Sequence, residues 1–239
     1  MPTNLEMPRP DEWTGDLFEF IEDCWNNSIA VVGNNNVIAA RMSAIDIIFH
    51  QVVQGLKPKQ AELLVPVMLL LRSFSAFRAA VMIGLSLPAE SFALQRSCLE
   101  HAGYAKLIAT DIKLSRLWVQ RDENLAEIRK QFTNRAVRDA IEKDDREVAK
   151  VYQELYERSI DFGAHPNEKA VLGSVVPGTL DTGNLMITML GGESVQLYHS
   201  LRSCAQVGIC SLKIFNLVFP AHFATHDFAN KIVAASRSF

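Results

Sequence analysis

The residues best suited to chemistry lie in the stretch RSIDFGAHPN, at 158–167. Arg158 and His165 are seven positions apart, so a continuous helix would place them on one face. Gly163 is typical of a helix end, and Pro166 disfavours helical geometry at His165. We therefore expect a helix to end near Gly163, with His165 just past its C-terminus and turned back toward the last carbonyl groups.

Asp161 follows Arg158 by about one helical turn, so the stretch combines a fixed cation, a titratable imidazole and a carboxylate. Histidine can act as a general acid or base near neutral pH. The planar guanidinium of arginine can hold a phosphate or stabilise a phosphoryl transition state. Arg158, Asp161 and His165 are therefore the predicted catalytic residues, with metal-free RNA cleavage as the chemistry. The alternative is that His165 caps a helix while Arg158 and Asp161 form a surface ion pair.

A second polar group, Arg96, Glu100 and His101, occurs in an otherwise apolar stretch. Arg96 and Glu100 are one turn apart, and burying an unpaired charge is costly, so they should pair or meet partners from another helix. We expect these three residues to form the floor of a polar pocket that faces Arg158 and His165, and to bind substrate together with Asn167. The alternative is an internal ion pair that fixes the register of the helix.

Other histidines have weaker patterns. His222 and His226 are one turn apart with Asp227 adjacent, a spacing that can chelate a metal. No glutamate follows the first histidine, so the zinc-protease pattern fails and we predict no metal. His199 and Arg202 have no recognisable partner spacing. Phosphate-loop, Rossmann and nucleophile-elbow patterns are missing from the sequence, and we expect no cofactor.

Helical periodicity dominates the rest of the sequence. The expected fold is all-α, a single domain over 1–239 with about seven helices and a small extended or hairpin insertion near 170–190. Residues 1–10 form an N-terminal arm, 111–143 a charged amphipathic arm of one or two helices, and 171–192 the insertion. The expected helices run from Asp11 to the Gly-Asn run at 33–36, and then over 37–54, 59–84, 89–109, 145–163, 193–217 and 220–236. Pro66 either kinks the third of these or marks its late start.

The composition is that of a globular protein, with 49% hydrophobic and 21% charged residues among 239. A net charge of -3 gives no general reason to bind nucleic acid, so an RNA site would need a local basic patch. The four cysteines have apolar neighbours and no CxxC spacing, which fits free thiols in a reducing cytoplasm. The first residues have no apolar region typical of a secretory signal. The apolar segment 63–89 is interrupted by Pro, Ser and Arg, so we expect a buried core helix and no membrane contact.

An arginine followed by four to six residues and a histidine near a helix end is similar to the motif of HEPN domains. More specifically, LQRSCLEHAGYAKLI followed by ELYERSIDFGAHPN resembles a group of uncharacterised bacterial helical proteins related to HEPN, over about 60–215. In that group an Arg and a Glu on one helix accompany a later helix that ends in His-Pro. HEPN ribonucleases commonly have Asn, Asp or His after the arginine, whereas this chain has Ser159.

The resemblance implies a helical bundle, often a homodimer, with RNA as a partner and metal-independent endoribonuclease activity centred on Arg158 and His165. The rival interpretation is a non-enzymatic helical module that binds a small molecule or a protein. A ribonuclease predicts basic residues around the site, with Arg135, Arg138 and Lys150 as candidates. A binding module predicts a closed apolar cavity near the third helix, where Phe and Met gather.

Overall fold

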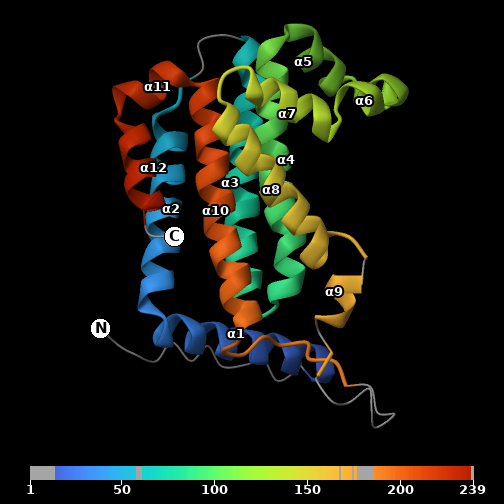
Figure 1. Cartoon of the computed structure of the whole chain (residues 1–239), viewed down its shortest axis with the longest axis vertical. Helices are drawn as coiled ribbons and strands as arrows, with labels where there is room; N and C mark the ends of the chain where they lie inside the picture. Colours follow the sequence, from blue (N-terminus) through green and yellow to red (C-terminus); the bar gives the residue numbers. More distant parts are fainter. Residues whose placement is uncertain (1–13, 58–60, 167, 174, 177–185, 238–239) are drawn as a thin grey trace.

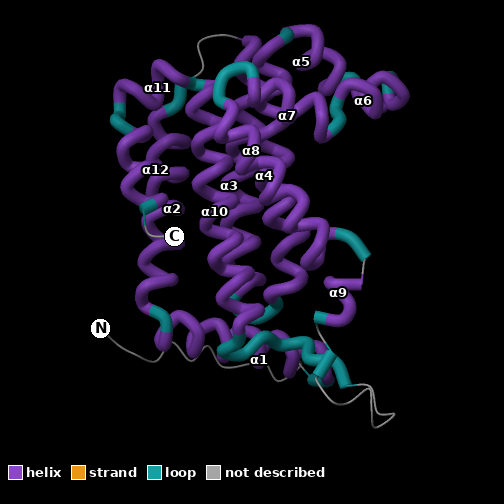
Figure 2. Tube along the Cα trace, viewed as in Figure 1, coloured by secondary structure: helices purple, strands orange, loops and turns teal. Residues whose placement is uncertain are grey.

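The computed structural model describes residues 14–57, 61–166, 168–173, 175–176 and 186–237. The described part is mostly helical and has no strand, which confirms the all-α prediction. The long helices stand roughly parallel in an upright bundle, and α1 crosses its lower end (Figure 1). Figure 2 shows short connections between most of the helices and a long one that leads into α10. The elements are α1 Asp16–Asn34, α2 Asn36–Gly55, η1 Ala61–Leu63, α3 Leu64–Gly84, α4 Pro88–Thr110, α5 Ile112–Val119, η2 Arg121–Glu123, α6 Leu125–Gln131, α7 Asn134–Glu142, α8 Arg146–Ser159, η3 Ile160–Ala164, α9 Glu168–Leu172, α10 Val195–Val218, α11 Pro220–Thr225 and α12 Phe228–Ser236.

The centre of the bundle consists of α3, α4 and α10, with α2 and α12 on one side and α7 and α8 on the other (Figure 1). Apolar side chains cover most of the circumference of α4 and α10, so both helices are buried. Phe49 of α2 stacks on Phe74 and Phe77 of α3, with ring centroids 5.2 and 5.4 Å apart. These aromatic residues of the third helix are therefore core residues and do not line a pocket.

Buried polar side chains join the two central helices. Ser91 of α4 and Ser200 of α10 are hydrogen-bonded through their hydroxyl groups, 2.7 Å apart. The Gln95 amide donates to the Ser91 hydroxyl at 3.0 Å. Such bonds are directional, so they fix how far α10 can slide along α4. The position of α10 along α4 in turn determines which residues of α10 lie beside the C-terminal end of α8.

Side-chain caps explain where several helices begin. Asp145 accepts a hydrogen bond from the Val148 N–H at the start of α8, and Ser194 accepts one from the Leu197 N–H at the start of α10. Pro88 occupies the first turn of α4, where its missing N–H costs nothing. These caps fix the residues at which α8 and α10 begin.

Several predicted boundaries were wrong. The first helix continues through Gly33, so only Asn35 separates α1 from α2. The third helix was expected from 59 and begins at Leu64, with Pro66 in its first turn, which confirms the alternative of a late start. The charged arm over 111–143 divides into α5, α6 and α7 with a short 3₁₀ turn, and 220–236 divides into α11 and α12. Asp227 causes the second division, because its φ of 55° is incompatible with a continuous helix.

The predicted insertion is described only at its two ends. Val175 and Ile187 form one antiparallel bridge, and the Val176 N–H donates to the Met186 carbonyl at 2.9 Å. Residues 177–185 and the arm at 1–10 lie outside the described residues, so the hairpin stays a prediction.

Two described helices, α2 and α3, are long and apolar enough to cross a membrane. In the most apolar 18-residue window of each helix, 28% of the window in α2 and 50% of the window in α3 is buried inside the bundle. The core helix of a soluble protein has the same length and composition, so these two helices are weak evidence for a membrane span. The absence of membrane contact stays a prediction.

Candidate functional site

The candidate site begins where α8 ends. After Ser159 the chain continues as a widened π-type turn over Ile160–Ala164, and His165 has the extended backbone expected just past a helix. Gly163 lies so close to α4 that a Cβ atom there would be 1.9 Å from the Ala89 carbonyl oxygen. Glycine is therefore required by this close approach, which holds the turn against the first residues of α4.

The turn delivers Phe162 to an aromatic cluster with Phe92 of α4 and His199 of α10. The ring centroids of Phe162 and His199 are 4.7 Å apart, and those of Phe92 and His199 are 5.9 Å apart. Phe162 is 37% exposed, whereas Phe92 is buried. The imidazole of His199 therefore lies half-buried, with two phenyl rings fixing its orientation.

Two guanidinium groups accompany this imidazole. Arg158 donates from Nη1 to Gln206 Oε1 at 2.6 Å, which ties α8 to α10. Burial lowers the pKa of Arg158, and the nearby charge of Arg202 acts in the same direction, while Glu154 opposes them. Arg202 is exposed, and its guanidinium has no hydrogen bond or ion pair within the part of the chain that the structure describes.

The pKa of His199 is lowered from 6.5, first by burial and then by the charges of Arg158 and Arg202. Neither ring nitrogen is hydrogen-bonded among the described residues. The lowered pKa favours the uncharged form of the ring, on which two nearby cations act. We name Arg158, His199 and Arg202 the Arg–His–Arg cluster. A phosphate oxygen is the ligand that suits two guanidinium groups, and a hydroxyl proton is what a neutral imidazole accepts.

The other residues of the predicted catalytic stretch have partners of their own. Asp161 forms an ion pair with Lys169 of α9, with the oxygen and nitrogen 2.6 Å apart. His165 is exposed, and its Nδ1 lies 3.2 Å from the Pro166 carbonyl oxygen. Arg158 instead turns toward α10. A direct pairing of Arg158 with His165 stays a prediction, and Asn167 lies outside the described residues.

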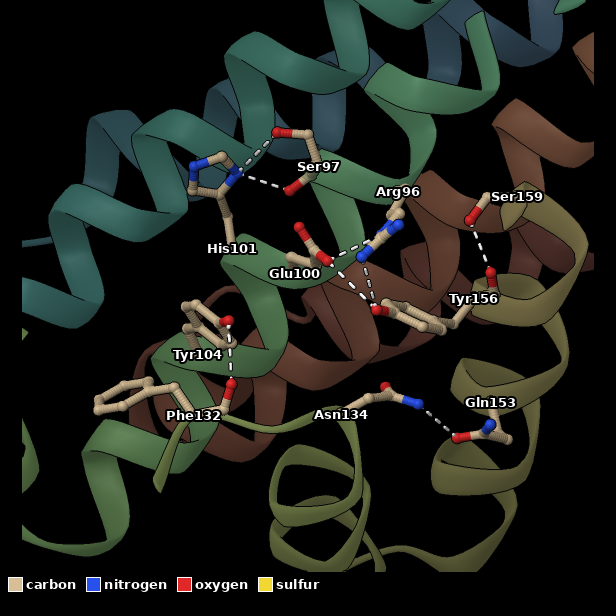
Figure 3. Close-up of polar contacts among 10 residues, drawn as sticks. All are labelled: Arg96, Ser97, Glu100, His101, Tyr104, Phe132, Asn134, Gln153, Tyr156 and Ser159. Carbon is tan, nitrogen blue, oxygen red and sulfur yellow. Dashed lines mark hydrogen bonds and ion pairs between the residues drawn. The ribbon is translucent and has the colours of Figure 1, made fainter. Parts of the chain in front are cut away.

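Arg96 and Glu100 form the expected pair one turn apart, with Nε and Oε1 separated by 2.9 Å (Figure 3). Tyr156 of α8 completes the group, because Arg96 Nη2 donates to its hydroxyl at 2.9 Å. The guanidinium carbon also lies 5.0 Å from the centroid of the Tyr156 ring. This arrangement joins α4 to α8 two residues before Arg158, which makes it a support for the Arg–His–Arg cluster.

His101 faces another direction. Its Nδ1 donates to the Ser97 carbonyl at 2.6 Å, and its ring lies apart from the Arg96 group (Figure 3). Burial lowers the pKa of His101, and the charge of Arg72 on α3 contributes in the same sense. His101 therefore bonds within α4, whereas Arg96 bonds to Tyr156 of α8. A substrate-binding role for either residue stays a prediction.

His222 and His226 lie with ring centroids 5.0 Å apart, and His222 Nε2 donates to the Val52 carbonyl at 3.1 Å. Within the described ranges, three or more His, Cys, Asp or Glu side chains nowhere gather as metal ligands. The His222 ring instead attaches α11 to α2. It has a structural role that its spacing alone did not indicate.

The basic residues expected near the site lie elsewhere. Arg138 and Lys150 line a cavity of about 650 Å³ on the outer face of α7 and α8, together with Glu142 and Glu147. Arg135 is 85% exposed and lies 3.8 Å from Asp139. This outer surface carries both signs of charge, so it offers no basic groove.

The sequence contains a signal for part of the cluster in the spacing of three polar residues on α10. His199, Arg202 and Gln206 are spaced three and then four residues apart, so α10 places them on one face. Arg158, which bonds to Gln206, lies 48 residues before that residue in sequence. A scan of protein-family models and searches of curated proteins and of solved structures each found no match for this chain.

Three histidines predict how stability depends on pH. The pKa values of His101, His199 and His222 are all lowered from 6.5, in each case chiefly by burial. Between pH 6.5 and these lowered values the unfolded chain binds more protons than the folded chain. The free energy of unfolding should therefore fall as the pH decreases from about 7.5 to about 5. Urea unfolding at several pH values measures this free energy. The variant His199→Gln should show a shallower decrease with falling pH. A midpoint that rises on acidification would contradict the prediction.

Proposed function

We propose that this chain is a HEPN-like, metal-independent endoribonuclease that binds single-stranded RNA on the face shared by α8 and α10. The Arg–His–Arg cluster holds the scissile phosphate, and His165 contributes from the adjoining turn. The observation that carries the proposal is how α8 and α10 meet. Arg158 bonds to Gln206 of α10, and Phe162 of the adjoining turn contacts the His199 ring, with centroids 4.7 Å apart, while the charges of Arg158 and Arg202 act on that ring.

In the proposed reaction, the His199 ring accepts the proton of a ribose 2′-hydroxyl, and the 2′-oxygen forms a bond to the adjacent phosphorus. The bond from phosphorus to the 5′-oxygen breaks, and His165, acting as the general acid, gives a proton to that leaving oxygen. Arg158 and Arg202 stabilise the negative charge that develops on the non-bridging oxygens. The products are a 2′,3′-cyclic phosphate and a 5′-hydroxyl group.

The geometry around the turn supports this division of roles. Phe162 contacts the His199 ring and lies three residues before His165. The turn that carries His165 therefore also touches His199. His165 is exposed and can meet a leaving group at the surface. The two histidines differ in burial, because His199 is half-buried and His165 is exposed, so their surroundings suit different roles.

The test is incubation of the purified protein with single-stranded RNA in EDTA. We expect cleavage to give cyclic-phosphate ends, and His199→Ala to lower the rate by about 10²–10⁴-fold, the usual contribution of a general base. His165→Ala should lower it less for substrates with a good leaving group. Cleavage that EDTA abolishes, or that survives His199→Ala unchanged, would refute the mechanism.

A second candidate is the protein-binding module, because α1 exposes an apolar stripe. Leu17 and Trp25 are each 66% exposed, and Ile21 and Ile29 lie on the same face. Exposed apolar patches of this kind mark interaction sites. We also propose that the protein is a homodimer in the cytoplasm, and the stripe on α1 is compatible with such a dimer. If the protein binds no RNA but associates through α1, the module is the better description.

A further inference from the structure

A small cavity lies between α2 and α10, next to the Arg–His–Arg cluster. Its volume is about 150 Å³. It is lined by Ile38, Arg41, Met42, Tyr198, Leu201 and Arg202. An apolar cavity of roughly this volume accommodates a single six-membered aromatic ring.

The lining suits a flat ring that also has polar edges. Ile38, Met42 and Leu201 provide an apolar floor, whereas Arg41 and Arg202 bring guanidinium groups. The Tyr198 hydroxyl donates to Asn35 Oδ1 at 3.2 Å, which anchors the tyrosine ring at the wall. Aromatic rings and guanidinium planes are the surfaces on which the bases of single-stranded nucleic acids stack.

Arg202 links the cavity to the catalytic face. It lines the cavity on one side and, on the other, its charge acts on both Arg158 and His199. A phosphate bound by Arg158 and Arg202 would therefore have the base of a neighbouring nucleotide within reach of the cavity. The positions along α10 agree, because Arg202 follows Tyr198 by four residues and His199 by three, so it neighbours both side chains on the helix surface.

We propose that this cavity binds one unpaired pyrimidine base of the RNA, next to the phosphate held by the Arg–His–Arg cluster. This inference rests on the proposed function and adds a substrate class to it. A base inside a duplex is stacked and paired, so the substrate is single-stranded at that nucleotide. A two-ring purine exceeds the cavity, so a pyrimidine is preferred at that position.

The test measures binding of a fluorescent hexauridylate made with 2′-O-methyl riboses, which prevent cleavage. A single abasic nucleotide is moved along the strand, and in a second series a single adenosine replaces each uridine. We expect one position at which loss of the base weakens binding about tenfold, as base–aromatic stacking predicts. Adenosine should weaken binding at that same position. Tyr198→Ala should abolish both differences, whereas Tyr198→Phe should retain them because it keeps the ring.

Arg158→Ala distinguishes the phosphate site from the base site, because losing the phosphate site should weaken binding of all these strands alike. If Arg158→Ala weakens binding but no abasic position matters, or Tyr198→Ala leaves the differences intact, the base site is wrong and the phosphate site stands. If adenosine binds as well as uridine at the sensitive position, the pyrimidine preference is overturned. If no strand binds, the proposed function and the base site both fall.

Discussion

Replacing Arg158 by alanine should lower the rate of RNA cleavage by about 10²–10³-fold, the usual cost of removing one donor to a developing oxyanion. The side chain is held by Gln206 and has Arg202 as its cationic neighbour, so it is already positioned before substrate binds. Single-turnover kinetics at saturating RNA measure the effect on the chemical step, and fluorescence anisotropy measures the loss of binding.

Two further variants make this result specific. Arg158→Lys keeps the charge but loses the planar fork, so it should recover binding more than cleavage. Arg135→Ala removes an equally charged residue that is 85% exposed on α7 and should leave both properties unchanged. If Arg158→Ala and Arg135→Ala behave alike, the cluster has no special role.

Gly163→Ala should destabilise the protein more than any other single methyl addition near the site. The new Cβ would lie 1.9 Å from the Ala89 carbonyl oxygen and 3.3 Å from the Phe92 Cβ, and neither neighbour is the end of a flexible side chain. Overpacking of this kind costs about 1–3 kcal/mol, and a contact with backbone belongs at the upper end. The turn must move away from α4, which also takes Phe162 off the His199 ring. Urea unfolding measures the first effect, and the His199 ring signals in NMR spectra report the second.

Gly33→Ala is the matched control. Gly33 lies within α1 and no atom would meet its Cβ within 4 Å. Alanine there should stabilise the protein by about 0.5–1 kcal/mol, because it restricts the unfolded chain and favours the helix. Equal unfolding midpoints for the two variants would show that the turn does not depend on its contact with α4.

The helices were predictable because their signals are local. The central helix over 89–109 agrees with α4 to within a residue at each end, since Pro88 starts it and the apolar residues surround it. The prediction that the first helix ends at Gly33 was wrong, because glycine disfavours a helix by only about 1 kcal/mol. The flanking turns of α1 outweigh that cost. The divisions of the charged arm depend on turns such as the one at Asn124, whose composition is not distinctive.

The site was predictable only in part. Arg158, Arg96 and Glu100 were singled out from their own segments, and each is a polar group at a helix–helix contact. Their partners were not foreseen, because Gln206 and Tyr156 meet them through the packing of separate helices. A side chain can satisfy its charge with any neighbour that packing supplies, and spacing within one segment cannot rank those neighbours.

The central claim is that a phosphate binds between Arg158 and Arg202 against the His199 ring. The most direct measurement is an NMR titration of the histidine rings over pH, with and without uridine 3′-monophosphate, using His199→Gln to assign the signals. Without ligand the pKa of His199 should lie below 6.5. With ligand it should rise, because a bound anion offsets the two cations. The rise should be lost in the double variant Arg158→Ala, Arg202→Ala. A His199 pKa that is unchanged by the nucleotide, while the signals of another histidine respond, would contradict the account.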